Sequence, residues 1–314
     1  MRRKGEDCMA DDFYQAPGRP EDPTKDYIVH ATAMGGQVRA VAIRSTQLVQ
    51  KMQQIHKMSP VAAVALGRFM TGSLLLASNL KGDNVTQTTI LRCDGPLKGM
   101  TAVCDSNGHV RAYAQEPVVE NFYHRPGKLN IAAAVGNGSL SVIRESGKGE
   151  PYSGSVELVS GEIAEDFTYY LASSEQTPSI VSLGVLIENG QIRAAGGFLI
   201  QLMPGAVEET VQYLEKRTEG AFPDITFLLT EGLNPEHIID MFIGQEDISF
   251  LSAREVEYRC SCSRDRMQRN LITLGAKELM ELAEDPQGIR LECHFCDQVY
   301  AFSQEEIQDL AASV

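Results

Sequence analysis

The sequence predicts an α+β protein: a main domain with a mixed, largely antiparallel sheet, a helical linker and a small C-terminal domain. The dipeptides Asn107-Gly108 and Asn189-Gly190 each separate two runs of strand-forming residues, as in tight antiparallel hairpins. After Gly205 the pattern changes to short, charged helices. Near the C-terminus four cysteines occur as two close pairs, which indicates a small domain organised by these side chains.

Residues 1–25 are polar and include three prolines and a glycine in their second half. A segment of this composition buries too little apolar surface to fold alone. We therefore expect a disordered extension or a leader, in which the single Cys8 has no functional role.

Residues 26–205 carry the pattern of the main domain. A hairpin is expected between Ile28 and Ile43, and Ser59-Pro60 begins a long apolar helix. A second helix is expected at residues 163–173. The remaining strands are predicted at residues 86–93, 100–104, 109–114, 140–145, 154–159, 182–188 and 191–202.

Residues 206–258 are expected to form a metastable helical linker. Val207, Val211 and Leu214 make one apolar stripe on a highly charged helix, and Asn234-Pro235 begins another helix. Helices this short have little intrinsic stability, so they persist only when they dock on another surface.

The segment 259–314 contains Cys260-x-Cys262 and, after thirty residues, Cys293-x-x-Cys296. A Cys-x-x-Cys knuckle places two thiolates on one turn, where both can bind a tetrahedral ion at about 2.3 Å. The candidate apolar core of this segment is thin, and a domain of this size rarely folds without a staple. We therefore predict a zinc-binding domain in which the four cysteines hold one Zn²⁺.

Four sulfurs complete a tetrahedral shell and leave no open position for water, so a catalytic zinc is not expected. His294 lies inside the knuckle but outside this shell, and Arg264 and Arg266 partly offset the negative charge of the site. Two interpretations remain open: a structural zinc ribbon, or a redox switch in which oxidation of the zinc-bound thiolates ejects the metal. Cys93 and Cys104, in strands of the main domain, are expected to be small buried apolar residues.

Composition and charge narrow the functional classes further. The 314 residues are 43% hydrophobic and 22% charged, with a net charge of −14 and a pI near 4.9. Nucleic-acid binding requires a basic face, and no dense Lys/Arg cluster is present. No apolar run is long enough to cross a membrane and no secretory signal is visible, so we expect a cytoplasmic protein whose thiols stay reduced.

Several blocks of the sequence occur in the same order in one known family. The most specific are CSCSRDR at 260–266 and CHFC at 293–296, followed by Tyr300. The others are GEIAED at 161–166, SEQTPS at 174–179 and GGFLIQLMPG at 196–205. With these blocks the chain resembles, from about Tyr27 to its C-terminus, the 33 kDa chaperonin family of redox-regulated bacterial heat-shock holdases. The N-terminal extension departs from the family, whose members usually begin near Tyr27.

The resemblance implies an ATP-independent holdase chaperone and not an enzyme. The reduced form would be an inactive monomer with one zinc ion per chain. Peroxide with heat, or hypochlorous acid, would form the disulfides Cys260–Cys262 and Cys293–Cys296, release zinc and unfold residues 206–258. The protein would then dimerise, bind unfolding client proteins and prevent their aggregation, until thioredoxin- or glutaredoxin-type systems reduce it again.

Three other functions fit the residues less well. A zinc-ribbon nucleic-acid binder would share the cysteines but should carry a basic face. A thiol–disulfide oxidoreductase could use Cys293-x-x-Cys296, but its reactive cysteine should begin a helix, whereas the flanking runs here indicate a hairpin. An enzyme in the main domain is disfavoured because no nucleophile–base pair or phosphate-binding loop is visible.

Overall fold

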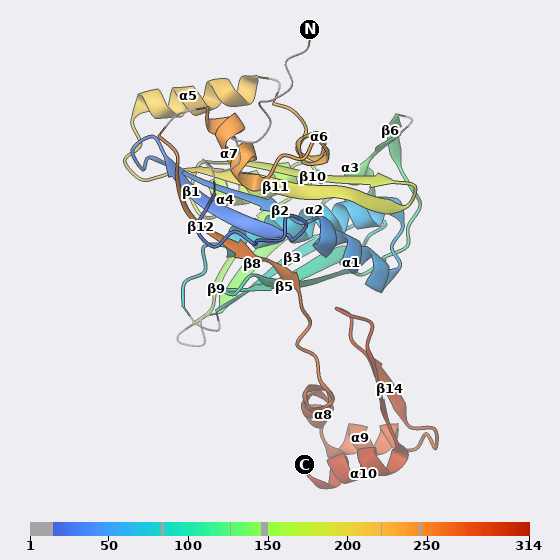
Figure 1. Cartoon of the computed structure of the whole chain (residues 1–314). Coiled ribbons are helices and arrows are strands. Elements are labelled where there is room, and N and C mark those ends of the chain that lie inside the picture. The colour runs from blue at the N-terminus through green and yellow to red at the C-terminus, as the bar shows by residue number, and fades with distance from the viewer. Residues whose placement is uncertain (1–14, 83–84, 126, 146–149, 221, 245–246) are drawn as a thin grey trace. The chain divides into compact units, whose positions relative to one another are not determined.

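The computed structural model describes residues 15–82, 85–125, 127–145, 150–220, 222–244 and 247–314. The chain divides into two compact units, Met1–Tyr258 and Arg259–Val314. The first unit contains two large sheets and most of the helices, and the second contains three helices and one short hairpin (Figure 1).

Sheet A has five strands in the order β10-β11-β2-β1-β12, and every neighbouring pair is antiparallel. Two of its connections are the hairpins that the sequence predicts: Ala33 pairs with Val38, and Glu188 pairs with Gln191 across Asn189-Gly190. The strands are β1 (Tyr27–Ala33), β2 (Val38–Arg44), β10 (Ser179–Glu188), β11 (Gln191–Leu202) and β12 (Ser249–Glu255).

Sheet B has six strands in the order β13-β5-β4-β3-β8-β9; β13 runs parallel to β5 and the other neighbours are antiparallel. The predicted Asn107-Gly108 turn joins β4 to β5, with Gly108 at a φ of 87° that favours glycine. The strands are β3 (Thr86–Cys93), β4 (Gly99–Asp105), β5 (His109–Ala114), β8 (Gly138–Glu145), β9 (Tyr152–Glu157) and β13 (Glu257–Tyr258). A separate small hairpin pairs β6 (Tyr123–Arg125) with β7 (Lys128–Leu129).

The main core is built around α2 (Pro60–Ala77), the long helix predicted after Ser59-Pro60. Side chains of both sheets join it in one apolar cluster, together with α1 (Thr46–His56), α3 (Ile131–Val135) and α4 (Ala164–Ser173). Gly72 permits the close approach of α4, since a Cβ there would lie 2.5 Å from the Phe167 ring. Contrary to the expectation from the sequence, one segment, α2, is by length and composition apolar enough to cross a membrane, but 89% of it is buried inside the fold, as in a core helix.

The outer face of sheet A, on the side away from α2, is covered by α5 (Glu208–Glu219), α6 (Ile225–Thr230) and α7 (Pro235–Ile243) (Figure 1). The ring centroid of Phe198 on β11 lies 4.8 Å from that of Phe242 on α7 and 5.6 Å from that of Phe222. The short helices of residues 206–258 therefore dock on an apolar surface, as their low intrinsic stability requires.

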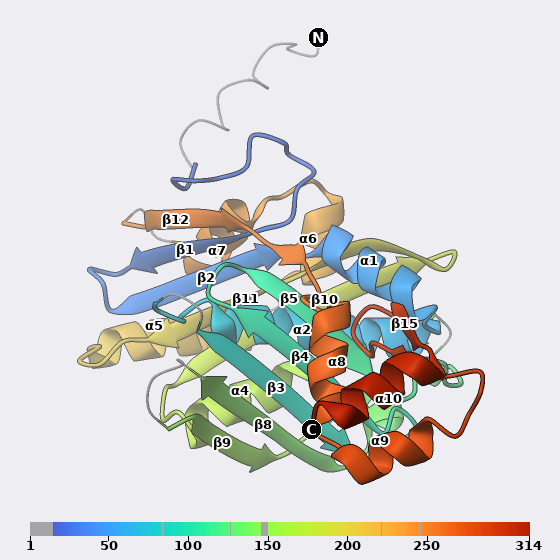
Figure 2. The ribbon, with the colours of Figure 1, turned by 90° about the horizontal axis from the view of Figure 1, so that it is seen from below.

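The same segment ends in two strands that the sequence did not indicate. β12 pairs with β1 at the edge of sheet A (Figure 2), and β13 pairs with β5 of sheet B. The segment is thus helical as far as Ile243 and extended from Ser249, where β12 exposes most of its side chains and lacks clear alternation. The two sheets, the covering helices and the second unit confirm the predicted α+β class.

Residues 15–25 differ from the predicted disordered extension, while residues 1–14, with Cys8, lie outside the described part of the chain. Ala16 is buried, and its amide donates to Oε1 of Glu236 on α7 at 3.4 Å. The carbonyl of Pro17 accepts a hydrogen bond from the amide of Ala253 on β12 at 2.6 Å. The segment lacks a core of its own but gains order from the surface it contacts.

Tyr27→Phe should destabilise the first unit by about 1–3 kcal/mol, because the buried carboxylate of Glu236 would lose the donor to its Oε2 and keep only the long hydrogen bond from the Ala16 amide. Glu236 is 0% exposed, and the Tyr27 hydroxyl donates to its Oε2 at 2.8 Å. Urea unfolding followed by circular dichroism measures the change. Tyr123→Phe is the matched control, since the Tyr123 side chain is 55% exposed. Equal losses in the two variants would contradict this role for Tyr27.

Candidate metal centre

The second unit has a very small apolar core. It consists of α8 (Arg264–Ile272), α9 (Ala276–Leu282), the hairpin of β14 (Ile289–Glu292) and β15 (Val299–Phe302), and α10 (Gln304–Ala312). Its buried cluster is limited to Leu271, Leu279, Ala283, Phe302, Ile307 and Ala311. So small a cluster rarely stabilises a domain alone, which agrees with the need for a further crosslink inferred from the sequence.

Cys293 and Cys296 lie on the turn between β14 and β15. The carbonyl of Cys293 accepts hydrogen bonds from the amides of Cys296 at 3.1 Å and Asp297 at 2.8 Å, and Asp297 has a positive φ of 56°. The amide of Cys293 donates to the carbonyl of Gln298 at 3.0 Å, which closes the loop. These bonds form the knuckle in a hairpin that the sequence predicts.

Cys260 and Cys262 lie in the segment without regular secondary structure immediately before α8. Ser263 caps this helix, since its hydroxyl accepts a hydrogen bond from the amide of Arg266 at 3.2 Å. The cap fixes where the helix begins, so the two cysteines precede the helix and are not constrained by its geometry.

The four cysteines converge on one point. Their Sγ atoms all lie within 4.8 Å of one another, with 3.7 Å between Cys260 and Cys293 and 3.3 Å between Cys262 and Cys296. All four are free thiols, and Cys293 is buried while the others are half-buried. Four sulfurs bound at about 2.3 Å to one tetrahedral ion would lie about 3.8 Å apart, so the cluster could hold a metal ion.

Burial and hydrogen bonds within the cluster shift the pKa values of these thiols. Burial is the main cause that raises the pKa of Cys260 to about 11, and it also raises the pKa of Cys296. For Cys262 burial acts in the same direction, but hydrogen bonds from Tyr300 and from the other thiols outweigh it and lower the pKa. A divalent cation among the sulfurs would favour the thiolate form of all four.

The sequence did not predict that Tyr300 contacts the cluster, although this residue follows the second cysteine pair in the family motif. Its hydroxyl donates to Sγ of Cys262 at 3.2 Å. This hydrogen bond raises the pKa of Tyr300 to about 12, since a phenolate would lose it. The strand-like runs that flank the knuckle could have placed Tyr300 near it, but not against a cysteine of the other pair.

The predicted neighbours of the cluster have more specific partners than the sequence suggested. Arg264 donates to the carboxylate of Glu306 at 2.5 Å and lies over the Phe302 ring, with its guanidinium 4.4 Å from the ring centroid. Arg266 donates to the hydroxyl of Ser261, between the first two cysteines, at 3.2 Å. His294 is exposed and stands outside the group of four sulfurs.

The remaining described cysteines lie in the first unit. Cys104 is 1% exposed, and burial raises its pKa strongly. Cys93 is half-buried at the end of β3, and burial raises its pKa as well. The expectation of small buried apolar residues therefore holds for Cys104 and in part for Cys93.

If the cluster holds a metal, Tyr300→Phe should weaken the binding of added Zn²⁺ by about 10–100-fold while all four cysteines remain, because the hydrogen bond to Sγ of Cys262 would be lost. Competition with a chromophoric chelator measures the affinity. Tyr169→Phe, an exposed tyrosine of α4, is the control and should bind zinc as the unaltered protein does. Unchanged affinity in Tyr300→Phe would show that this hydroxyl does not support the cluster.

Comparison with known proteins agrees with the resemblance seen in the motifs. The model of the family described as Hsp33 protein matches residues 26–303. The 33 kDa chaperonin of Ruminiclostridium cellulolyticum is 46% identical over 285 residues, which cover 91% of this chain and 97% of that protein. The 33 kDa chaperonin of Acetivibrio thermocellus is 43% identical over 284 residues, or 90% and 96% of the two chains.

A solved structure extends the likeness to the fold. The crystal structure of the 33 kDa chaperonin from Thermotoga maritima matches with a TM-score of 0.85 and 33% identity, covering 92% of this chain and 98% of that chain. The chain therefore belongs to the Hsp33 family of 33 kDa chaperonins, a family of chaperones and not of enzymes, and it carries a four-cysteine cluster that could hold a metal.

Proposed function

We propose that this protein is a redox-regulated, ATP-independent holdase chaperone whose four-cysteine cluster controls the docking of residues 206–258. The observation that carries the proposal is the convergence of four free thiols within 4.8 Å in a unit with almost no core of its own. Thiols in such a unit serve as both its crosslink and its oxidisable group.

The metal that we assign to the reduced form is one Zn²⁺ per chain, bound by Cys260, Cys262, Cys293 and Cys296. A closed shell of four thiolates is typical of structural zinc. Zinc binding to such sites contributes on the order of 10–16 kcal/mol of apparent folding free energy at neutral pH. Loss of the metal would therefore remove most of what stabilises the second unit.

Oxidation would convert the ligands into the disulfides Cys260–Cys262 and Cys293–Cys296. For each bond, two thiolates lose two electrons to one hypochlorous acid molecule, which with one proton becomes chloride and water. In the reduced cluster, sulfur contacts of 3.7 and 3.3 Å join members of different pairs. Pairing within each motif is nevertheless favoured once the cluster opens, because sequence neighbours stay within reach while the two motifs separate.

The covalent path from the cluster to the covering helices is short. β13 ends at Tyr258, two positions before Cys260, and the Tyr258 hydroxyl donates to the carbonyl of Ala112 at 2.9 Å. β12, just upstream, pairs with β1 and follows α7 in the chain. Unfolding of the second unit would thus free one end of this connection and lower the stability of α5–α7.

Undocking of α5–α7 would uncover the outer face of sheet A, which is lined by Val38, Ala40, Ala42, Phe198 and Ile200. An apolar face of this kind fits the apolar segments of unfolding client proteins. As further parts of the proposal, the oxidised form is a homodimer and the reduced form a monomer. Thioredoxin- or glutaredoxin-type systems reverse the switch, and the protein works in the reducing cytoplasm.

Hypochlorous acid should release zinc and, in the same dose range, induce suppression of aggregation of a thermally unfolding client such as citrate synthase. Zinc release is measured with a chromophoric chelator and aggregation by light scattering. Cys262→Ser should weaken zinc binding and shift the dose response, whereas Cys93→Ser, outside the cluster, should leave both unchanged. Complete zinc release without any suppression of aggregation would refute the holdase function, even though the metal assignment would survive.

Peptide mapping of the oxidised protein by mass spectrometry should recover the disulfides Cys260–Cys262 and Cys293–Cys296. Protein oxidised after denaturation serves as the comparison for statistical pairing. Recovery of Cys260–Cys293 and Cys262–Cys296 as the main products would instead mean that the thiols react before the cluster opens.

A further inference from the structure

A cavity of the first unit is lined by a cation, Arg39, that forms no ion pair with any residue in the described part of the chain. The cavity, of about 550 Å³, lies at the end of sheet A where β11 leads into α5, and its wall includes Arg39, Asn79, Gln201, Leu202, Met203 and Val211. This volume falls within the range of about 300–1,000 Å³ that is typical of small-molecule sites. None of these residues belongs to the cysteine cluster.

Arg39 is half-buried on β2, and its contacts are neutral. Among the residues that the structure describes, its guanidinium donates to Oε1 of Gln201 at 3.4 Å and to Nδ1 of His30 at 3.5 Å, and it makes no ion pair. Burial and the nearby Arg39 and Arg254 lower the pKa of His30 to about 4, so the imidazole is neutral and can accept this bond. Burying a charge without a counter-charge is unfavourable, and both hydrogen bonds are long.

Other charges of the cavity do not neutralise Arg39. Glu175 lines the same wall, but its carboxylate is engaged by Arg144 at 2.6 Å. Burial lowers the pKa of Arg39, and no acidic neighbour opposes that effect. The guanidinium therefore has unused donors beside a cavity, which is the arrangement that recognises a planar carboxylate in a bidentate manner.

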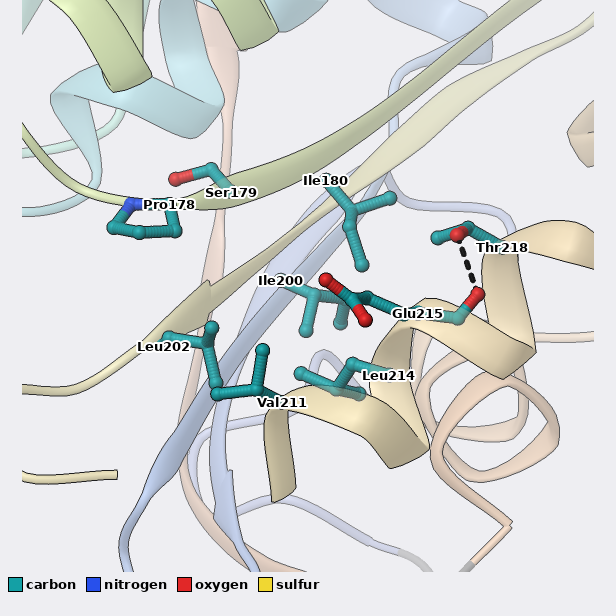
Figure 3. Close-up of a pocket in the computed structure, with 9 residues that line it drawn as sticks. All are labelled: Pro178, Ser179, Ile180, Ile200, Leu202, Val211, Leu214, Glu215 and Thr218. Atoms are coloured by element: carbon teal, nitrogen blue, oxygen red, sulfur yellow. Dashed lines mark hydrogen bonds between the residues drawn. The ribbon is translucent and has the colours of Figure 1, made fainter. Parts of the chain in front are cut away.

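The cavity continues into an apolar groove between sheet A and α5. The groove, of about 180 Å³, shares Pro178, Leu202 and Val211 with the cavity, and Figure 3 shows Leu202 of β11 beside Val211 of α5. Ile180 and Ile200 line its far part, where the carboxylate of Glu215 also points (Figure 3). An anionic group is disfavoured near Glu215, so only the apolar part of a ligand fits that end.

From this arrangement we infer that the first unit binds a small organic carboxylate, with the carboxylate on Arg39 and a short apolar body along Leu202 and Val211. Val211 belongs to α5, so the ligand contacts both the sheet and the covering helix. Binding would stabilise the docked helix by mass action. The site requires neither the metal nor the redox chemistry proposed above.

Calorimetric titration of the reduced, zinc-loaded full chain with butyrate, at constant ionic strength, tests the site. Butyrate should bind saturably with one site per chain, and the neutral butyramide should not bind. Affinity should rise from acetate to butyrate by up to about fourfold per methylene, as burial of each apolar group predicts. Inorganic phosphate should bind more weakly than butyrate, because it cannot use the apolar wall.

Variants of Arg39 and of a control arginine distinguish binding at this site from a general effect of positive charge. Arg39→Gln should weaken butyrate binding at least about tenfold, and Arg39→Lys, which keeps the charge but loses the planar fork, should be intermediate. Arg193→Gln on β11 is the matched control, since Arg193 is exposed and pairs with Glu188. Circular dichroism verifies that each variant is folded.

Four results would overturn the inference: equal binding of butyramide, tighter binding of phosphate than of butyrate, equal losses in Arg39→Gln and Arg193→Gln, or no saturable binding at tens of millimolar butyrate.

Discussion

The outer face of sheet A is apolar and has to be covered. Three short helices cover it, and each has too few residues to be stable in isolation. They are held by a small set of contacts: the Phe198–Phe242 pair, the side chain of Gln37, which accepts from the amide of Val207 at 2.8 Å, and Arg217, which donates to the carbonyl of Phe242 at 2.7 Å. We propose that a cover built from such short helices is only marginally stable, so that a modest loss of free energy would remove it.

The second unit, in contrast, has very little apolar surface to bury. Its six-residue buried cluster is too small to be expected to stabilise a fold alone, whereas a metal ion held by the four thiols would add the missing free energy. The group that can stabilise this unit is also the one most easily oxidised. Since only Arg259 separates Tyr258 from Cys260, a change at the sulfurs has a short covalent route to β12, β13 and the helices before them.

Local patterns made much of this predictable. The Asn-Gly turns, the Ser59-Pro60 helix start and the alternating runs placed most strands of both sheets, because the information for hairpins and caps lies within a few residues. The Cys-x-x-Cys knuckle was predictable for the same reason. That Cys260 and Cys262 complete the site was inferred from the four donors that a zinc ion needs and from the reducing compartment expected for the protein. The four sulfurs do converge in the structure.

Features that depend on distant partners were not predictable. β12 is a half-exposed edge strand whose pairing with β1 brings together residues more than two hundred positions apart, and nothing in its own sequence indicates that pairing. Residues 15–25 looked disordered because their order comes from Glu236 and Ala253. The same holds for the Tyr300–Cys262 hydrogen bond and for the neutral partners of Arg39, Gln201 and His30, since only the fold brings these side chains together.

We propose that the metal-bound cysteines hold α5–α7 on sheet A. Hydrogen–deuterium exchange followed by mass spectrometry, on reduced zinc-loaded and on oxidised zinc-free protein, tests it most directly. The account predicts that the amides of 206–258 lose protection on oxidation while those of α2 and the central strands of both sheets keep theirs. Unchanged protection of α5–α7 in the oxidised, zinc-free protein would contradict it.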